Sequence, residues 1–333
     1  MQKTVLSILF LIAFLFGVVY LSFFMTPKYG KPITALYGYV DKFGDYVISP
    51  RFYGAENFSE NLAAVQVDNL MGKWGYINPF GEFEIDPQYF RARPFSDGMA
   101  VVKPDIKSGY GYIDYQGKWV LGAHYKLATT FYNGMASVLY NNRRFYIDRF
   151  GQPLENQPAY GVTVFSDGMG KYSHNGKTGF LGADGEVVIP AQFLEAGQFA
   201  NGLAPVKVQT SVMQRWGYID KTGKMVIAPE FGEAGTFSQG LAPVKGGGFI
   251  GLFEKWGYIN PQGQWVIKPR YAMALEFSEG LAPAVEGSKW GFIDKTGKFY
   301  IPPKFDWAQP FHEGLAMVGL ERVPEAENAD APQ

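Results

Sequence analysis

"KWGFIDKTGKF", residues 289–299, has close counterparts at residues 215–225 ("RWGYIDKTGKM") and 255–265 ("KWGYINPQGQW"). The glycine of "WG" can serve as an anchor along the whole chain. The anchors are Gly38, Gly75, Gly111, Gly179, Gly217, Gly257 and Gly291, with Phe145 at the anchor position of an eighth unit. Six residues beyond each anchor is a glycine (Gly44 through Gly297), and twenty residues beyond is a phenylalanine (Phe58 through Phe311). Eight matches at two fixed offsets indicate a tandem repeat of about 36 residues.

Each unit has the pattern of a small antiparallel β meander. "WGYID" alternates and is rich in aromatic and β-branched residues, which predicts a strand. Asp or Asn then begins a tight turn, and the glycine that ends it suits the left-handed position of a type I turn with a G1 bulge. A second strand follows and ends at the proline of "I-x-P". An irregular link then leads to a last strand, "LAPV", which turns back into the next "KWG".

The variation in repeat length is confined to one hairpin. From the repeated phenylalanine to the next anchor the spacing runs 17, 16, 14, 14, 18, 20 and 14 residues, whereas the spacing from anchor to phenylalanine is constant. Insertions in repeat proteins usually lie on one face, often the binding face. We therefore expect the loops before each "KWG" to bind a partner. The loop residues that depart from the repeat, and that we predict to bind, are Arg143, Arg144, Arg215, Phe249 and Phe253.

Composition narrows the class of protein. The net charge of −1 argues against a nucleic-acid partner, which usually requires a basic surface. The absence of cysteine excludes disulfides, thiol catalysis and cysteine-bound metals. High aromatic and glycine contents favour short strands joined by tight turns. These features predict an all-β globular protein.

The N-terminal region predicts a membrane anchor. Residues 5–25 carry no charge over 21 positions, long enough for a helix to span the roughly 30 Å hydrocarbon layer. A cleaved signal peptide and a buried helix are the alternatives; the run has no small-residue cleavage site and no amphipathic face. We expect a four-residue flank (1–4), the anchor, a spacer (26–34), a repeat domain (35–320) and a disordered acidic tail (321–333), with the repeats outside the cytoplasm.

These motifs identify a resemblance. The pattern "KWGYID-x-x-GK-x-[VI]-I-P-P" followed by "FSEGLAPV" resembles the WG-repeat family of bacterial proteins, over about residues 36–318. The resemblance implies an envelope or surface protein used for interaction, with no shared catalytic residues, metal or cofactor. Two units depart from the pattern: Phe145 replaces the anchor glycine, and Thr178 replaces the tryptophan before Gly179.

Repeated polar residues have a structural interpretation. Asn replaces Asp in two of the turns, and Asx side chains routinely bond turn backbones, so a carboxylate ring for a metal is disfavoured. The repeated aromatics, at fixed offsets, suit packing between units. "GGGFIG" (246–251) lies in a hairpin loop, not between a strand and a helix, so it does not predict a dinucleotide site. His124, His174 and His312 have no paired spacing, which leaves a shared metal improbable.

The architecture has two possible forms, a closed propeller-like ring and an open superhelical array. The first strand (35–40) and the last (314–320) each lack the hairpin partner of internal copies, and pairing them would close a ring. About 36 residues is short for a four-stranded blade, which counts against the ring. We expect the ring, and with it a membrane-anchored, non-enzymatic interaction module of the bacterial envelope that binds a protein or a cell-wall polymer. The alternative is a glycan-acting enzyme or carbohydrate-binding protein that uses loop carboxylates such as Asp105 or Glu254, since glycoside hydrolysis needs two carboxyls within roughly 5–9.5 Å.

Overall fold

The structure is a computed structural model that describes residues 35–68, 72–154, 165–182, 185–246 and 254–321. Every regular element in these ranges is a β-strand. In this part of the chain no helix is long and apolar enough to cross a membrane. The predicted flank, anchor and spacer (1–34) and the tail after Glu321 lie outside the described residues, so these predictions remain untested.

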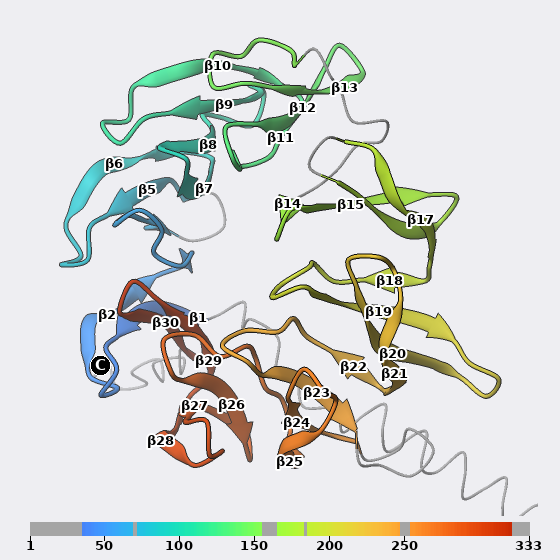
Figure 1. The fold of residues 1–333 in the computed structure, drawn as a ribbon. Helices are drawn as coiled ribbons and strands as arrows, with labels where there is room; N and C mark the ends of the chain where they lie inside the picture. Colours follow the sequence, from blue (N-terminus) through green and yellow to red (C-terminus); the bar gives the residue numbers. More distant parts are fainter. Residues whose placement is uncertain (1–34, 69–71, 155–164, 183–184, 247–253, 322–333) are drawn as a thin grey trace, which may run out of the picture. The chain divides into compact units, whose positions relative to one another are not determined.

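The strands form eight small antiparallel sheets, which we call blades 1 to 8 (Figure 1). Each blade has up to four strands, named inner, second, third and outer. The inner strands, for blades 1 to 7, are β29 (Trp307–His312), β3 (Gly54–Ala55), β7 (Arg91–Ser96), β11 (Leu127–Ala128), β14 (Phe165–Ser166), β18 (Glu195–Ala196) and β22 (Glu233–Ala234). The second strands, for blades 1 to 8, are β30 (Leu315–Glu321), β4 (Ala63–Gln66), β8 (Met99–Lys103), β12 (Ala136–Tyr140), β15 (Met169–His174), β19 (Leu203–Gln209), β23 (Ala242–Gly246) and β26 (Ala282–Glu286).

The third strands carry the "WG" motif. They are β1 (Ala35–Val40), β5 (Trp74–Ile77), β9 (Tyr110–Ile113), β13 (Arg143–Ile147), β16 (Lys177–Leu181), β20 (Gln214–Asp220), β24 (Lys255–Ile259) and β27 (Lys289–Ile293). The outer strands carry "I-x-P". They are β2 (Tyr46–Phe52), β6 (Phe83–Tyr89), β10 (Trp119–Tyr125), β17 (Val187–Phe193), β21 (Met225–Phe231), β25 (Trp265–Tyr271) and β28 (Phe299–Phe305), for every blade except blade 4.

The ring is closed by the two ends of the repeat domain. β1 pairs with β30 in antiparallel register from Ala35↔Glu321 to Val40↔Ala316, so one blade is built from both ends of the domain. The sheet order is β2-β1-β30-β29. The predicted closed ring is confirmed as an eight-bladed propeller arrangement, because this pairing removes the two edges that an open array would expose.

The objection that 36 residues is too short for a four-stranded blade is wrong. Six of the eight described sheets have four strands. The inner strand comes from the link that the sequence marked as irregular, and in several blades it is only two residues long, as in Glu195–Ala196 and Glu233–Ala234. A two-residue strand has no periodicity, which is why the sequence pattern did not reveal it.

The anchor position requires glycine because the outer strand bulges over it. In blade 8, Trp290 pairs with Phe305 and Phe292 pairs with Ile301. Between these two pairs the chain advances two positions along β27 but four along β28, which is the bulge. A β-carbon added at Gly291 would lie 2.5 Å from the carbonyl oxygen of Ile301. The same outer-strand backbone lies against every other anchor glycine, and only glycine leaves room for that approach.

The core lies between neighbouring blades, as predicted from the fixed aromatic offsets. The aromatic residue after each anchor packs against the repeated phenylalanine of the next blade; Tyr39 and Phe58 have ring centroids 4.8 Å apart, and Tyr76 and Phe95 4.9 Å. All eight repeated phenylalanines are buried. The tyrosine hydroxyl donates to a carbonyl oxygen of the adjoining inner segment, as Tyr39 does to Glu56 at 2.7 Å. Each junction is thus sealed by an aromatic pair.

Blade 4 is the exception, and it contains the departure at Phe145. Its sheet has three described strands, β11, β12 and β13. Phe145 occupies the anchor position and pairs with Val138. No outer strand lies against it in the described residues, so nothing there requires a glycine.

Candidate binding faces

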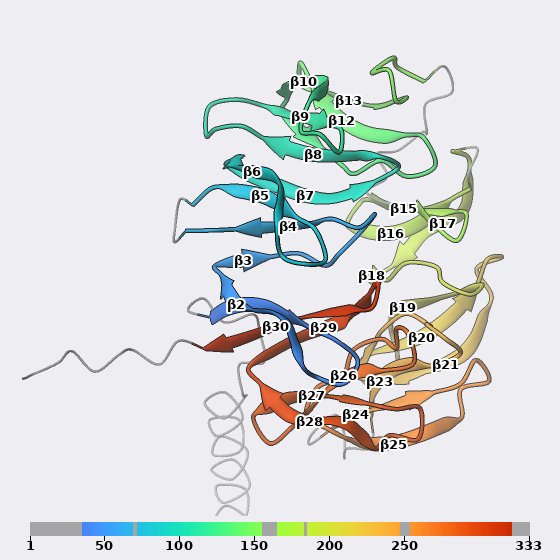
Figure 2. The ribbon, with the colours of Figure 1, turned by 90° about the vertical axis from the view of Figure 1, so that its left-hand side faces the viewer.

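The strand order gives the ring two different faces. In a sheet whose four strands follow in sequence, the inner–second and third–outer turns lie at one end and the second–third hairpin lies at the other. We call the first end the turn face and the second the loop face. The variable hairpins, including 208–215, are on the loop face, and so are the start of β1 and the end of β30. Figure 2 shows the ring from its side, with β30 ending at one edge.

The third–outer turns have the predicted structure. Asp294 Oδ1 accepts hydrogen bonds from the backbone N–H groups of Thr296 (2.8 Å) and Lys298 (3.1 Å), and Gly297 N–H donates to the Asp294 carbonyl. Gly297 has φ of +82°. The same pair of bonds occurs at Asp41, Asn78, Asp114, Asp148, Asp220 and Asn260. The structural interpretation of these Asx residues is confirmed.

The Thr hydroxyls add to this bonding in two turns. Thr296 Oγ1 donates to Asp294 Oδ1 at 2.6 Å, and Thr222 does the same to Asp220. These hydroxyl bonds are the main cause of the lowered pKa of both carboxyls. The carboxylates are therefore occupied in holding their own turns.

The inner–second turns form a second ring that the sequence did not predict. The residue before the glycine of "FSxG" has positive φ in every blade, as at Asp167 (+52°) and Glu279 (+52°). Its side chain accepts the backbone N–H of the next blade's turn: Asp167 from Gly202 at 2.6 Å, and Glu279 from Gly314 at 3.1 Å. In equivalent bonds, Glu313 accepts from the N–H groups of Glu60 and Asn61, Glu60 from Gly98, Asp97 from Gly134 and Gln239 from Gly280.

Two lysines of the third–outer turns form ion pairs with side chains of this second ring. Lys221 lies 2.8 Å from Asp167, and Lys42 lies 3.0 Å from Glu279. The pKa of Asp167 is lowered, first by Lys221 and then by the Gly202 N–H. The pKa of Glu279 is also lowered: burial would raise it, but the Gly314 N–H and Lys42 together outweigh that effect. Most polar groups of the turn face are thus used to hold blade to blade.

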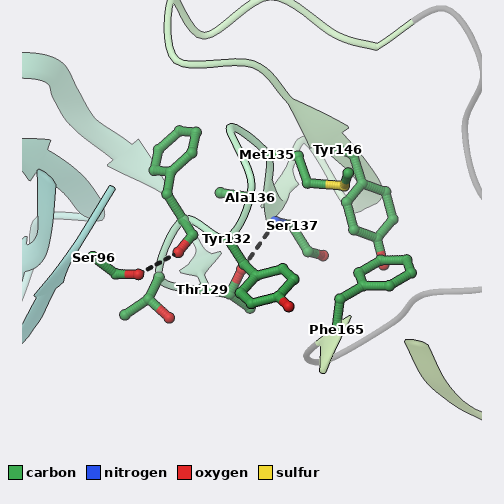
Figure 3. Close-up of a pocket in the computed structure, with 10 residues that line it drawn as sticks. Ser96, Thr129, Tyr132, Met135, Ala136, Ser137, Tyr146 and Phe165 are labelled. Atoms are coloured by element: carbon green, nitrogen blue, oxygen red, sulfur yellow. Dashed lines mark hydrogen bonds between the residues drawn. The ribbon is translucent and has the colours of Figure 1, made fainter. Parts of the chain in front are cut away.

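Two junctions within the described residues lack this bond. Between blades 6 and 7, the Asn201 side-chain amide instead donates to the Phe237 carbonyl at 3.3 Å. The other is the junction of blades 4 and 5. Asn133 of blade 4 takes the equivalent position, and no hydrogen bond joins it to Gly168 of blade 5 in the described structure. A cavity of about 80 Å³ lies here, lined by Tyr132, Met135 and Phe165 (Figure 3). It has room for little more than water.

The structure separates the predicted binding residues into exposed, largely buried and undescribed ones. Arg143 and Arg144 are exposed at the loop-face end of β13, beside the two-residue turn that joins it to β12. Arg215 is not a loop residue; it lies in β20 and forms an ion pair with Glu254 at 2.6 Å, with side chains only 15% and 7% exposed. Phe249 and Phe253 lie outside the described residues. The structure brings together Arg215 and Glu254 of neighbouring blades. The sequence analysis had assigned Arg215 to the interaction module and Glu254 to the alternative enzyme.

The carboxylates proposed for the enzyme alternative are engaged elsewhere. Glu254 is held by Arg215. Asp105 accepts bonds from the hydroxyl and N–H of Ser108 and from the Lys107 N–H, and the Ser108 hydroxyl is the main cause of its lowered pKa. In the described residues there is also no group of three or more His, Asp or Glu that could hold a metal.

A groove at the loop-face end of blades 6 to 8 was missed by the sequence analysis. It encloses about 450 Å³ and is lined by Trp216, Trp256, Met273, Lys207 and the carboxylates Glu195, Glu233 and Glu276. Glu195 is paired with Lys207, and Glu233 with Lys245. The signal in the sequence is the "EA" of two successive links, which places one glutamate on β18 and one on β22.

The loop face also exposes apolar side chains. Val212 is 76% exposed and Ile106 is 55% exposed, each within a second–third loop. These side chains, with Arg143 and Arg144, give the loop face a mixture of apolar and basic groups that no repeat position requires.

The fold and the repeated turns define a β-propeller built from tandem repeats. A family model described as "WG containing repeat" matches residues 37–70, 74–104, 110–143, 179–209, 216–248, 256–290 and 290–321. These matches cover more than half of the chain, so the protein belongs to the WG-repeat family. The resemblance noted in the sequence is confirmed, and the stretch without a match contains Phe145.

Solved structures with a similar fold have little sequence in common with this chain. A eukaryotic initiation factor has a TM-score of 0.50 at 10% identity, covering 87% of this chain and 98% of that one. The Hsv2 protein of Kluyvelomyces marxianus has a TM-score of 0.44 at 10% identity, covering 72% and 90%. Virginiamycin B lyase from Staphylococcus aureus has a TM-score of 0.35 at 13% identity, covering 85% and 99%. The first of these shares the fold alone with this chain. Curated protein sequences give no match.

Proposed function

We propose that the repeat domain is a non-enzymatic interaction module, anchored by residues 5–25 in the inner membrane of a bacterium and exposed outside the cytoplasm. Its partner is a protein or a cell-wall polymer bound at the loop face. A repeat β-propeller suggests a protein-interaction scaffold in general. The membrane anchor, the envelope location and the kind of partner are the specific parts of the proposal.

The observation that carries the proposal is the difference between the two faces. Turns such as 294–297 have one length and one set of bonds, so the turn-face polar groups are mostly used within the ring. The loop-face hairpins vary in length while the blades that support them stay the same. A surface that varies on a fixed scaffold is the usual place for partner recognition.

The proposed location of that partner follows from where the N-terminal segment joins the repeat domain. β1 starts and β30 ends on the loop face, so residues before Ala35 leave the domain from that face. The nine spacer residues 26–34 reach at most about 30 Å when extended. If residues 5–25 cross a membrane, this short spacer keeps the repeat domain near that membrane, and its partner is a membrane-proximal one.

Site-specific photo-crosslinking tests the loop face. A photoreactive amino acid placed at Val212 or Ile106 of the full chain in cells should give a discrete crosslinked product. The matched control is Gln262, a turn-face residue of blade 7. The proposal is overturned if both loop positions give no product, or if Gln262 gives the same product.

A carbohydrate-binding function is the second candidate, and the groove at Trp216 favours it. The half-buried indole of Trp216 can pack against a sugar ring while the carboxylates and lysine beside it bond to the sugar hydroxyls. The full chain in neutral detergent should then co-sediment with isolated peptidoglycan, and Glu233→Gln should reduce the bound fraction severalfold. Release of soluble fragments from that peptidoglycan would instead support the enzyme alternative.

A further inference from the structure

Three of the turns that follow the third strands carry phenylalanine at their tips, where the side chain is largely exposed. Phe43, Phe80 and Phe150 occupy the same turn position in blades 1, 2 and 4, and are 75%, 81% and 82% exposed. Blade 3 has Tyr115 one position earlier, 41% exposed. The aromatic tips therefore occupy four consecutive blades of the turn face.

The fold does not require these aromatics. The same position is Thr222 in blade 6, Gln262 in blade 7 and Thr296 in blade 8, and the two threonines make the turn bonds described above. An exposed phenylalanine makes no such bond and leaves apolar surface in water, at a cost of about 25 cal/mol per Å² relative to burial. Clustered exposed apolar groups of this kind mark interaction sites.

A groove lies between the aromatic turns of blades 2 and 3. It encloses about 660 Å³ and is lined by Glu60, Glu84, Pro79, Tyr115 and Gln116, among others, with no lysine or arginine in its lining. The Glu60 carboxylate accepts from the Gly98 N–H and the Tyr115 hydroxyl. Glu84 accepts from the amide of Asn78 at 2.9 Å. The groove thus presents two carboxylates and no cation of its own.

Two of the cations around the aromatic tips are already engaged. Lys42 is paired with Glu279, and Arg51 donates to the Gly81 carbonyl at 2.7 Å. Arg149 lies beside Gly98 and the Tyr115 hydroxyl, at the Glu60 end of the groove, and makes no ion pair within the described residues. An anionic lipid surface needs a surplus of available positive charge, whereas here the open charge in the groove is negative. Protein surfaces with apolar and basic groups match this combination better.

We propose that the turn face of blades 1 to 4 binds a second protein through a segment that bears a lysine or arginine between apolar side chains. The basic group enters the groove at Glu60 and Glu84, and apolar groups contact the tips of other turns: Phe80 of blade 2, Phe43 of blade 1 and Phe150 of blade 4. This surface is on the opposite face from the loop-face partner, so the inference does not depend on the proposed function. With both partners bound, the ring would bridge two molecules on opposite faces.

Selection from a displayed library of random dodecapeptides tests this. The full chain in neutral detergent is the bait, and the triple variant Phe43→Ser, Phe80→Ser and Phe150→Ser is the counter-bait. Because the three side chains are exposed, the variant should keep its melting temperature. Peptides that bind the native chain should carry Lys or Arg flanked by apolar residues, and should bind the triple variant at least tenfold more weakly.

Two matched variants sharpen the outcome. Glu84→Gln should weaken binding of the selected peptides severalfold, whereas Gln262→Ser, at the blade 7 position that corresponds to Phe80, should not. Equal binding to the triple variant, or selected peptides without basic residues, would overturn the proposal. So would displacement of the peptides by soluble dihexanoylphosphatidylglycerol, which would identify a lipid site, or Phe-dependent dimerisation in size-exclusion chromatography, which would identify a second copy as the occupant.

Discussion

The two faces of the ring are made by the same repeat but differ in how their residues are used. On the turn face, residues such as Asp167 and Asp294 hold backbone groups, so each carboxylate has a structural partner. On the loop face, Arg143 at the start of β13 and Val212 in a second–third loop are exposed. Repetition therefore fixes the face where blades are joined and leaves the opposite face open to change. The predictions below test this contrast, from the largest expected effect to the smallest.

Gly291→Val should have the largest effect on stability. The new side chain would meet the Ile301 carbonyl, which is backbone and cannot rotate away. Overpacking of this kind costs about 3 kcal/mol or more, which chemical denaturation of the full chain would measure. Gly122→Ala is the control, because its added β-carbon meets only the His124 ring at 3.5 Å. Similar losses in both variants would contradict the bulge explanation.

Arg215→Ala should destabilise the protein by about 2–3 kcal/mol, since it leaves the carboxylate of Glu254 without its partner in a nearly buried site. The double variant Arg215→Ala with Glu254→Ala should recover part of this loss. A double-mutant cycle read by melting temperature checks the coupling. Additive effects would show that the pair does not support blade packing, and would return Arg215 to the set of binding candidates.

Gly297→Val should cost about 1–2 kcal/mol or more, because a branched residue at φ of +82° is strained. The added β-carbon would also lie 2.8 Å from the Ile267 side chain of the preceding blade. Denaturant unfolding measures the loss, and Gly297→Asn, which tolerates this conformation better, should lose less. An unchanged midpoint for the valine variant would refute the turn assignment.

Stability should fall in acid in two steps. The pKa of His312 is lowered, because desolvation of this partly exposed ring outweighs the opposing effect of Glu279 and Glu313, so the folded state resists its protonation and stability declines slightly as the pH falls below about 6.5. Asp167 and Glu279 also have lowered pKa values, so their contribution is complete above about pH 4.5 and is lost as the pH falls through the lowered values. Melting curves across pH should show both steps, and His312→Gln should remove the first alone. A first step that persists in this variant would contradict the assignment.

Arg143→Ala and Arg144→Ala should have the smallest effects on stability, within about 0.5 kcal/mol, because exposed side chains contribute little to folding. Asp167→Asn, its turn-face counterpart, should cost about 1 kcal/mol by weakening the bonds to Gly202 and Lys221. Calorimetry of the variants makes the comparison. Equal losses on both faces would remove the distinction drawn between them.

The sequence predicted the parts of the fold that depend on short segments. The Asx residue and glycine of each turn are three residues apart, and the turn bonds join residues within that span. Ring closure was also predictable, because the strands at 35–40 and 314–320 each lacked a partner. The role of the anchor glycine was not predictable, since it depends on a bulge in a strand ten residues further along the chain. Repeat spacing also placed Arg215 in a loop, although it pairs across blades with Glu254.

The exposed aromatics were missed for a related reason. Phe43, Phe80 and Phe150 lie at a position that the repeat pattern leaves unspecified, and their exposure is set by the folded turn. A comparison of residue types at that single position would have found them: it is phenylalanine in blades 1, 2 and 4, and threonine or glutamine in blades 3, 6, 7 and 8.

The sequence by itself determined the repeat, the turn chemistry and the all-β class, because these follow from hydrogen bonds between residues close in the chain. Only the tertiary structure decided how the faces are used. Glu313 reaches Glu60 across 253 positions, and Lys304 donates to the Gly44 carbonyl across 260. Such contacts exist only after the ring closes, since closure brings the first and last blades to the same spacing as any other neighbours.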